Sequence, residues 1–418
     1  MLRNYLIIAW KGLFRHKFVT AVSLLGIGVT LMVLTILVAY LESYLGNTRP
    51  EVNRSRSLYL TKMTEKGVGN SVTTSGISYF YYTNHVLPLQ SPEATSIFSH
   101  SAPLPVQGKL GKMRFKVKYT DAAFWQLNEF KFLFGHHFTK SDVDNDAHMV
   151  VICSSMARAL FDAEPGAALG QEVVFDNKTM KVVGIVEDPL NHGMVSFSEM
   201  WVPISLGRFD LSKPTFTGSF SAQVLAHHPS DFQEIIEEYE HKVSQVSHPD
   251  QNSIESFNAP LVSHQQFALK VVVYALFNSE PPSALTFYAV LASLVLVIMF
   301  IPAINLININ SARIRERLSE IGIRKAFGAS GRSLVVQFLT ENVFLCIMGG
   351  ILGLLLSLIS IHFLNDVNIL HGAYLTINFT VLFIGFLLTV LFGLLSGILP
   401  AFKMSRLQIV HVLKKQRS

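Results

Sequence analysis

Residues 311–330 read SARIRERLSEIGIRKAFGAS, and this stretch separates two long apolar runs that carry no charge, residues 283–312 and residues 342–365. Residues 311–332 together hold six basic and two acidic side chains. An apolar run of about 20 residues is long enough to cross the hydrocarbon core of a bilayer. The sequence therefore predicts a charged segment that connects two membrane-spanning helices.

The composition and the remaining apolar runs indicate a membrane protein with several spans. Half of the 418 residues are hydrophobic and only 15% are charged, which is unusual for a soluble globular chain. Further uncharged runs occupy residues 18–40 and residues 367–402. We predict a membrane α-helical fold with four transmembrane helices and a large α+β extracytoplasmic domain inserted between the first and the second. The predicted helices are residues 18–40, 283–310, 333–364 and 374–402.

The first run resembles a secretory signal because a basic leader precedes it. It is longer than the apolar part of a signal peptide, however, and no small-x-small cleavage site follows Tyr40. We interpret residues 18–40 as an uncleaved anchor. In residues 1–17 the apolar side chains share one helical face, which predicts a cytoplasmic amphipathic helix in the membrane interface.

The distribution of basic side chains predicts the orientation. Residues 1–17 hold four basic and no acidic side chains, and residues 403–418 hold five basic and none acidic. Loops rich in Lys and Arg stay in the cytoplasm, so both termini and the loop 311–332 are predicted to be cytoplasmic. Residues 41–282 hold 19 basic and 25 acidic side chains. This domain and the short loop 365–373 are therefore predicted to lie in the periplasm, and the membrane is predicted to be the inner membrane. The basic excess of the chain comes from the cytoplasmic segments and does not indicate a nucleic-acid surface.

The large outer segment is predicted to be folded from both strands and helices. Residues 171–175 and 180–186 are strand-like and flank a turn at residues 176–178, and residues 154–161 are typical of a short helix. Ser230 followed by Gln233 predicts a capping box at the start of a helix. Further strands are predicted at residues 57–62, 113–119 and 220–226, and their spacing indicates two lobes.

Motifs for catalysis or cofactor binding are absent from the sequence. There is no GxxxxGK[ST] phosphate loop and no GxSxG nucleophile motif. The adjacent pairs His136-His137 and His227-His228 are poor joint metal ligands. Cys153 and Cys346 fall in different parts of the chain, so a disulfide between them is not expected. We expect neither an enzyme nor a protein with its own metal or cofactor.

Polar and small residues within the spans are further candidates. Glu341 is the acidic residue inside a predicted span, and an ionisable group at such a position is either functional or paired for packing. Both interpretations remain open for it. The spacings Gly349-x-x-x-Gly353 and Gly393-x-x-x-Gly397 permit close approach of neighbouring helices.

The charged segment presents two apolar faces when it is drawn as a helix. Ile314, Leu318 and Ile321 fall on one face, whereas Ile323 and Phe327 point the opposite way. One interpretation is an amphipathic loop held at the lipid headgroups by its arginines. The other is a docking helix for a cytoplasmic partner, which the presence of two exposed apolar faces favours.

At these residues the sequence resembles the FtsX-like permeases, which are the membrane subunits of MacB-type ABC transporters. The resemblance extends to residues 148–189, which are similar to the MacB-like periplasmic core domain, and to residues 399–415 at the end of the last span. It implies that the loop couples the permease to an ATPase. The implied coupling residues are Glu320, Ile321, Gly322, Ile323, Arg324, Ala326, Phe327, Gly328 and Ala329.

The resemblance also implies partners and a mechanism. We expect a pair of cytoplasmic ABC ATPase subunits that bind the ATP, and a second permease that is either identical or homologous. A periplasmic adaptor and an outer-membrane channel are further expected partners. ATP-driven movement of the spans would move the periplasmic domain, a mechanism called mechanotransmission, and so expel peptides, toxins or amphiphiles. Release of lipoproteins as in LolC-like subunits, regulation of cell-wall hydrolases as in FtsX, and a sensor without transport remain as alternatives.

Overall fold

The computed structural model describes residues 17–69, 71–189, 195–250, 253–277, 330–367 and 379–405, with isolated positions between 285 and 327 and residue 375. The chain divides into two compact units. Ser43–Pro281 forms one, which we call the globular unit, and Met1–Glu42 with Pro282–Ser418 forms the other, which we call the helical unit. The predicted interfacial helix, nearly all of the predicted second span and the part of the predicted cytoplasmic tail after residue 405 lie outside the described residues.

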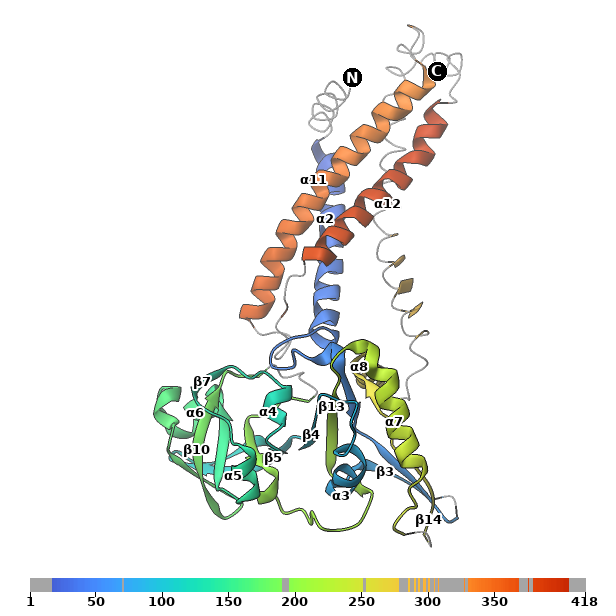
Figure 1. The fold of residues 1–418 in the computed structure, drawn as a ribbon. Helices are drawn as coiled ribbons and strands as arrows, with labels where there is room; N and C mark the ends of the chain where they lie inside the picture. The colour runs from blue at the N-terminus through green and yellow to red at the C-terminus, as the bar shows by residue number, and fades with distance from the viewer. Residues whose placement is uncertain are drawn as a thin grey trace. The chain divides into compact units, whose positions relative to one another are not determined.

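The globular unit contains both strands and helices (Figure 1). Its strands are β1 Ser57–Leu60, β2 Met63–Gly67, β3 Val72–Ile77, β4 Ala94–Ser99, β5 Ala102–Gly108, β6 Gly111–Thr120, β7 Phe132–Gly135, β8 Met149–Cys153, β9 Glu172–Phe175, β10 Lys178–Val186, β11 Met200–Pro203, β12 Thr217–Gly218, β13 Phe220–Leu225, β14 Ile254–Asn258 and β15 Val262–Ser263. Its helices are α3 Tyr79–Tyr81, α4 Phe124–Leu127, α5 Lys140–Asp144, α6 Ser154–Phe161, α7 Phe232–Ser244 and α8 His264–Phe277.

The strands follow one hydrogen-bonded path, in the order β11-β8-β10-β9-β5-β6-β4-β13-β3-β2-β14. A further parallel pairing of β11 with β6 closes the first six of these into a ring. β7 pairs with β10 of the ring, and the remaining strands extend from the ring through β4, which pairs with both β6 and β13. In Figure 1 the ring carries α5 and α6, whereas α7 and α8 lie with the extended strands.

Large apolar side chains fill one continuous core in the globular unit. Trp201, Tyr59 and Phe124 belong to it and have no measurable exposure. Burial of apolar area is the main favourable contribution to folding. Because β6 pairs with β5, β4 and β11, it runs through the centre of this core and contacts both parts of the sheet.

The helical unit is described by three long helices, α2 (Lys17–Leu45), α11 (Gly331–Asp366) and α12 (Phe379–Ser405). The last three residues of α2 already belong to the globular unit. Within the described part of the chain, the segments Thr20–Ser43 and Val335–Asp366 are long and apolar enough to cross a membrane. The α12 helix falls in the range of the predicted fourth span, and the count of four remains a prediction.

Local patterns in the sequence correspond to several of these elements. The predicted helix at residues 154–161 is α6, and the predicted turn joins β9 to β10 with Asp176 and Asn177 in the left-handed region, at φ values of 53° and 60°. Asp and Asn tolerate this conformation better than most residues. The predicted capping box was wrong. Asp231 accepts a hydrogen bond from the backbone N–H of His228, because a short 3-10 turn at Pro229–Asp231 precedes α7 and moves the helix start past Ser230.

Candidate coupling site

Arg54 covers the end of the first long helix. The last carbonyl groups of a helix have no partners within it, and the helix dipole favours a basic side chain there. The guanidinium of Arg54 donates from Nη1 to the carbonyl oxygens of Ser43 and Gly46, each at 2.9 Å. Only 2% of Arg54 is exposed. A buried positive charge is therefore held against the end of α2.

Glu51 balances the charge of Arg54. Its Oε2 accepts from Arg54 Nε at 2.8 Å, while its Oε1 accepts from the backbone N–H groups of Val195 and Ser196 at 3.0 and 2.7 Å and from the Ser196 hydroxyl at 2.7 Å. Burial alone would raise the pKa of Glu51. The Arg54 charge and the hydrogen bonds from Ser196 outweigh burial and lower this pKa to about 2. The carboxylate is thus ionised and fully hydrogen-bonded.

Lys118 extends the cluster to the central strand of the sheet. This residue lies on β6, is 3% exposed, and donates from Nζ to the carbonyl oxygen of Val195. Burial lowers the pKa of Lys118 to about 7, while the negative charge of Glu51 acts in the opposite direction. We call Glu51, Arg54, Lys118 and the segment Val195–Ser196 the ionic cluster.

The ionic cluster joins the end of α2 to β6 through hydrogen bonds between buried groups. Removing one partner from a buried ion pair typically costs about 3–5 kcal/mol, because the other charge stays buried without compensation. The hydrogen bonds run without a break from the carbonyl of Ser43 through Arg54, Glu51 and Val195 to Lys118. The arrangement offers no catalytic group; it is suited to transmitting movement.

Sequence reasoning missed this cluster. Glu51 and Arg54 are three residues apart, but Val195 and Lys118 are 144 and 67 positions from Glu51 in the chain. The available signal was weak: an acidic and a basic residue at a spacing of three, about ten residues after a predicted span. Such pairs are common on exposed surfaces, and burial is what gives this pair its importance.

Small residues bring α2 and α11 close together in the helical unit. A Cβ atom added at Gly349 would lie 2.8 Å from Cβ of Ile27, and one added at Gly353 would lie 2.8 Å from Cβ of Leu31. Glycine at both positions therefore permits an approach that any larger residue would prevent. Gly393 and Gly397 lie in α12, and the predicted packing role of all four glycines stays a prediction.

The other predicted site residues are placed only in part. Glu341 lies in α11, is partly buried, and its Oε1 accepts from Gln337 Nε2 at 3.2 Å. Phe327 is 88% exposed. The remaining predicted coupling residues, from Glu320 to Arg324, Ala326, Gly328 and Ala329, lie outside the described residues.

Metal-ligating side chains and thiols are the groups that would indicate a different chemistry. Among the residues that the structure describes, no three His, Cys, Asp or Glu side chains are grouped so as to hold a metal ion. Cys153 and Cys346 are both buried and occur as free thiols.

Residues 20–241 match the family of the MacB-like periplasmic core domain, and residues 292–409 match the FtsX-like permease C-terminal family. The chain is 24% identical over 417 residues to the pyoverdine export ATP-binding/permease protein PvdT of Pseudomonas fluorescens, covering 98% of this chain but 59% of that protein. It therefore spans less than two thirds of that relative's length. It is 26% identical over 314 residues to the uncharacterized ABC transporter permease YknZ of Bacillus subtilis, covering 72% of each.

Among solved structures, the periplasmic region of MacB from Actinobacillus actinomycetemcomitans aligns at 15% identity and a TM-score of 0.36, covering 54% of this chain and 94% of that one. This score is below the level that establishes a shared fold. The two family matches carry the assignment, since the first covers more than half of the chain and the second covers most of its C-terminal part. The chain belongs to the MacB-like permease family, with a periplasmic core domain followed by an FtsX-like permease region.

Proposed function

We propose that this chain is the membrane subunit of a MacB-type ABC transporter, and that it converts ATP hydrolysis by a separate cytoplasmic ATPase into movement of a periplasmic domain. In this proposal the chain lies in the inner membrane with both termini in the cytoplasm. The globular unit is the moving periplasmic part. The permease itself binds no ATP and acts as a dimer, with an identical or a homologous second copy.

The ionic cluster is the observation that supports this proposal most directly. A protein that only anchors a domain needs no more than a covalent linker after its span. Here the end of α2 is instead fixed to β6 through Arg54, Glu51 and Val195. Because α2 is a continuous helix of 29 residues, a tilt or shift of this helix would be delivered to the central strand of the globular unit.

Export is the proposed outcome of this movement. The relative from Pseudomonas fluorescens is named as an export ATP-binding/permease protein, and others are named as macrolide export proteins. We propose a related outward movement of peptides, toxins or amphiphiles here, with an adaptor and an outer-membrane channel as further partners. The names of these relatives favour export over lipoprotein release and over regulation of cell-wall hydrolases.

Residues 320–329 are proposed to receive the ATPase. The experiment is co-purification of the chain with its candidate ATPase, followed by measurement of ATP hydrolysis in the complex. Ile323→Asp and Phe327→Asp are expected to abolish co-purification, because a charge would be placed in an apolar contact. Val68→Asp is the matched control, since Val68 is also a strongly exposed apolar residue, at 62%, but lies in the globular unit. Co-purification that survives both Asp variants would contradict the proposal.

A further inference from the structure

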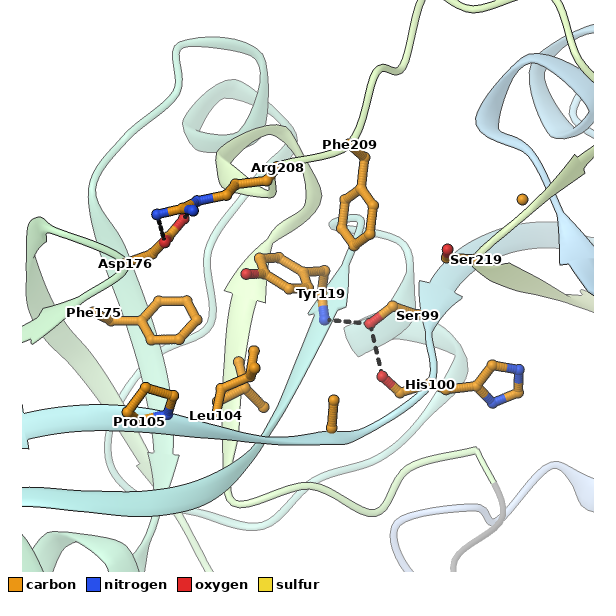
Figure 2. A pocket seen from close by; sticks show the side chains of 13 residues that line it. Ser99, His100, Leu104, Pro105, Tyr119, Phe175, Asp176, Arg208, Phe209 and Ser219 are labelled. Atoms are coloured by element: carbon orange, nitrogen blue, oxygen red, sulfur yellow. Dashed lines mark hydrogen bonds and ion pairs between the residues drawn. The ribbon is translucent and has the colours of Figure 1, made fainter.

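A cavity of about 680 Å³ opens within the globular unit, beside the strand that carries Lys118. One side is formed by β5, β6 and the end of β9, and the other by Arg208–Phe209 and Gly218–Ser219. Figure 2 shows the side chains of these segments gathered around a common space. Cavities of roughly 300–1,000 Å³ are typical of sites for small molecules, so this one has the size of a ligand site.

The inner part of the cavity is apolar and aromatic. Tyr119 and Phe175 are 8% and 3% exposed, with ring centroids 6.3 Å apart. Phe209 stands edge-on to Tyr119, with centroids 5.1 Å apart and ring planes at 87°. Leu104 and Val117 are among the aliphatic residues of this lining. Aromatic rings prefer edge-to-face or offset contacts with other rings, so these walls suit a flat apolar body.

The mouth of the cavity is polar and presents hydrogen-bond donors. Arg208 is paired with Asp176, from Nε to Oδ2 at 2.7 Å and from Nη2 to Oδ1. A guanidinium has five N–H donors, and this bidentate pairing uses two of them. The Arg208 side chain is 72% exposed, whereas that of Asp176 is 19% exposed. Asp176 is the one acidic group among the lining residues, and its charge is already matched.

We propose that this cavity binds a small amphiphile with a flat aromatic or similarly apolar body and an anionic headgroup. The body would lie against Tyr119, Phe175 and Phe209, and the headgroup would accept from the N–H groups of Arg208 that are not directed at Asp176. Hydrogen bonds between ions of opposite charge are stronger than neutral ones. The inference rests on the proposed function in one respect, because such a molecule would be a transported substrate.

The position of the cavity also connects it to the ionic cluster. Lys118 and Tyr119 are neighbours on β6, and successive side chains of a strand point to opposite faces. Lys118 contacts Val195 in the cluster, while Tyr119 lines the cavity. Movement delivered through α2 would therefore reach the strand against which the ligand lies.

The test measures binding to the full chain in lipid nanodiscs, without any ATPase. Two fluorescent probes with the same aromatic body are compared: anilinonaphthalene sulfonate, which is anionic, and phenylnaphthylamine, which is neutral. The signal of empty nanodiscs is subtracted. We expect saturable binding of the anionic probe. Phe209→Ala should lower the affinity for both probes about three- to tenfold, which is the range measured for aromatic contacts. Arg208→Gln should lower the affinity for the anionic probe only.

Two matched controls lie outside the cavity. Val174→Ala alters the neighbour of Phe175 on β9, whose side chain points to the other face of the strand. Arg158→Gln removes another partly exposed arginine, whose acidic neighbour Asp188 is 4.0 Å away. Both should bind the two probes as the parent chain does. Thermal unfolding of each variant identifies any that has lost its fold.

The outcomes separate this inference from the proposed function. Absence of saturable binding, or equal losses in Phe209→Ala and Val174→Ala, would overturn the cavity as a site. Equal affinity for both probes with no effect of Arg208→Gln would overturn the anionic class of ligand. Absence of an ATPase complex would overturn the proposed function and leave measured binding intact, whereas an active ATPase complex without probe binding would overturn this inference alone.

Discussion

The carboxylate of Glu51 and the guanidinium of Arg54 form an ion pair of 2.8 Å that is almost fully removed from water, with side-chain exposures of 1% and 2%. Each partner also makes hydrogen bonds outside the pair. Arg54 Nη1 donates to the Ser43 carbonyl at the end of α2, and Glu51 Oε1 accepts from the backbone N–H groups of Val195 and Ser196. The pair therefore determines whether the end of the helix and the segment at residue 195 move as one.

Arg54→Gln should destabilise the globular unit strongly. The substitution leaves Glu51 buried without its counter-charge, a situation that typically costs about 3–5 kcal/mol. Urea unfolding of the full chain, followed by tryptophan fluorescence, measures this loss, because Trp125 and Trp201 lie in the globular unit. Lys131→Gln is the control, since Lys131 and Glu187 form an exposed pair, which typically contributes about 0–1 kcal/mol. Similar losses of unfolding free energy in the two variants would show that the buried pair contributes no more to stability than the exposed pair.

Lys118 should make stability depend on pH. In the unfolded chain this lysine keeps its proton up to its ordinary pKa of 10.5, whereas burial lowers the pKa in the folded state to about 7. Between these values the unfolded state binds more protons, so the free energy of unfolding should rise as the pH rises from about 7. Urea unfolding at pH 7, 8 and 9 measures the slope.

Lys118→Met should remove this part of the pH dependence. Lys116→Met is the matched control, because Lys116 lies two residues earlier on β6 and is exposed, with its Nζ 4.6 Å from the centre of the Phe197 ring. It should keep the slope of the parent chain. If the free energy of unfolding of Lys118→Met depends on pH as steeply as that of the parent chain, Lys118 is not the source of the pH dependence.

Gly353→Ala should weaken the packing of α2 against α11. The added Cβ would lie 2.8 Å from Cβ of Leu31 and 3.0 Å from the carbonyl oxygen of Gly28, and overpacking of this kind typically costs about 1–3 kcal/mol. Gly28→Ala is the comparison variant and should cost less stability, because its added Cβ would lie 3.3 Å from Leu352 Cγ, a less severe contact. Thermal inactivation in detergent should rank the parent chain as most stable and Gly353→Ala as least stable. The reverse order of the two variants would exclude close packing at Gly353.

Cys153 should resist modification until the globular unit unfolds. It is 1% exposed, and burial raises the pKa of its thiol to about 12, so little thiolate is present at pH 8. In a Cys346→Ala background, maleimide labelling at pH 8 should be slow in buffer and fast in urea. Ser230→Cys, at an exposed position, should label quickly in both. Rapid labelling of native Cys153 would contradict its burial.

Local sequence patterns were informative where neighbours along the chain decide the structure. The apolar run near the N-terminus corresponds to α2, residues 154–161 form α6, and the turn at Asp176-Asn177 separates two strands. These features depend on side-chain periodicity and on the conformational tolerance of individual residues. The start of α7 shows the limit of this approach. Ser230 and Gln233 fit a capping pattern, but Asp231 makes the observed bond to His228, because Pro229 begins a tighter turn first.

The sequence by itself determined that the chain carries membrane-spanning helices and a folded domain, because apolar runs and charge distribution follow from the solubility of side chains in lipid and water. Its motifs also indicated the family, which the two family matches over residues 20–241 and 292–409 establish. Tertiary structure alone decided that Glu51 and Lys118 meet at Val195 while Glu51 also binds Arg54, and that Tyr119, Phe175 and Phe209 line one cavity. These contacts join residues far apart in the chain, and they arise from strand pairing and burial, which no short stretch of sequence encodes.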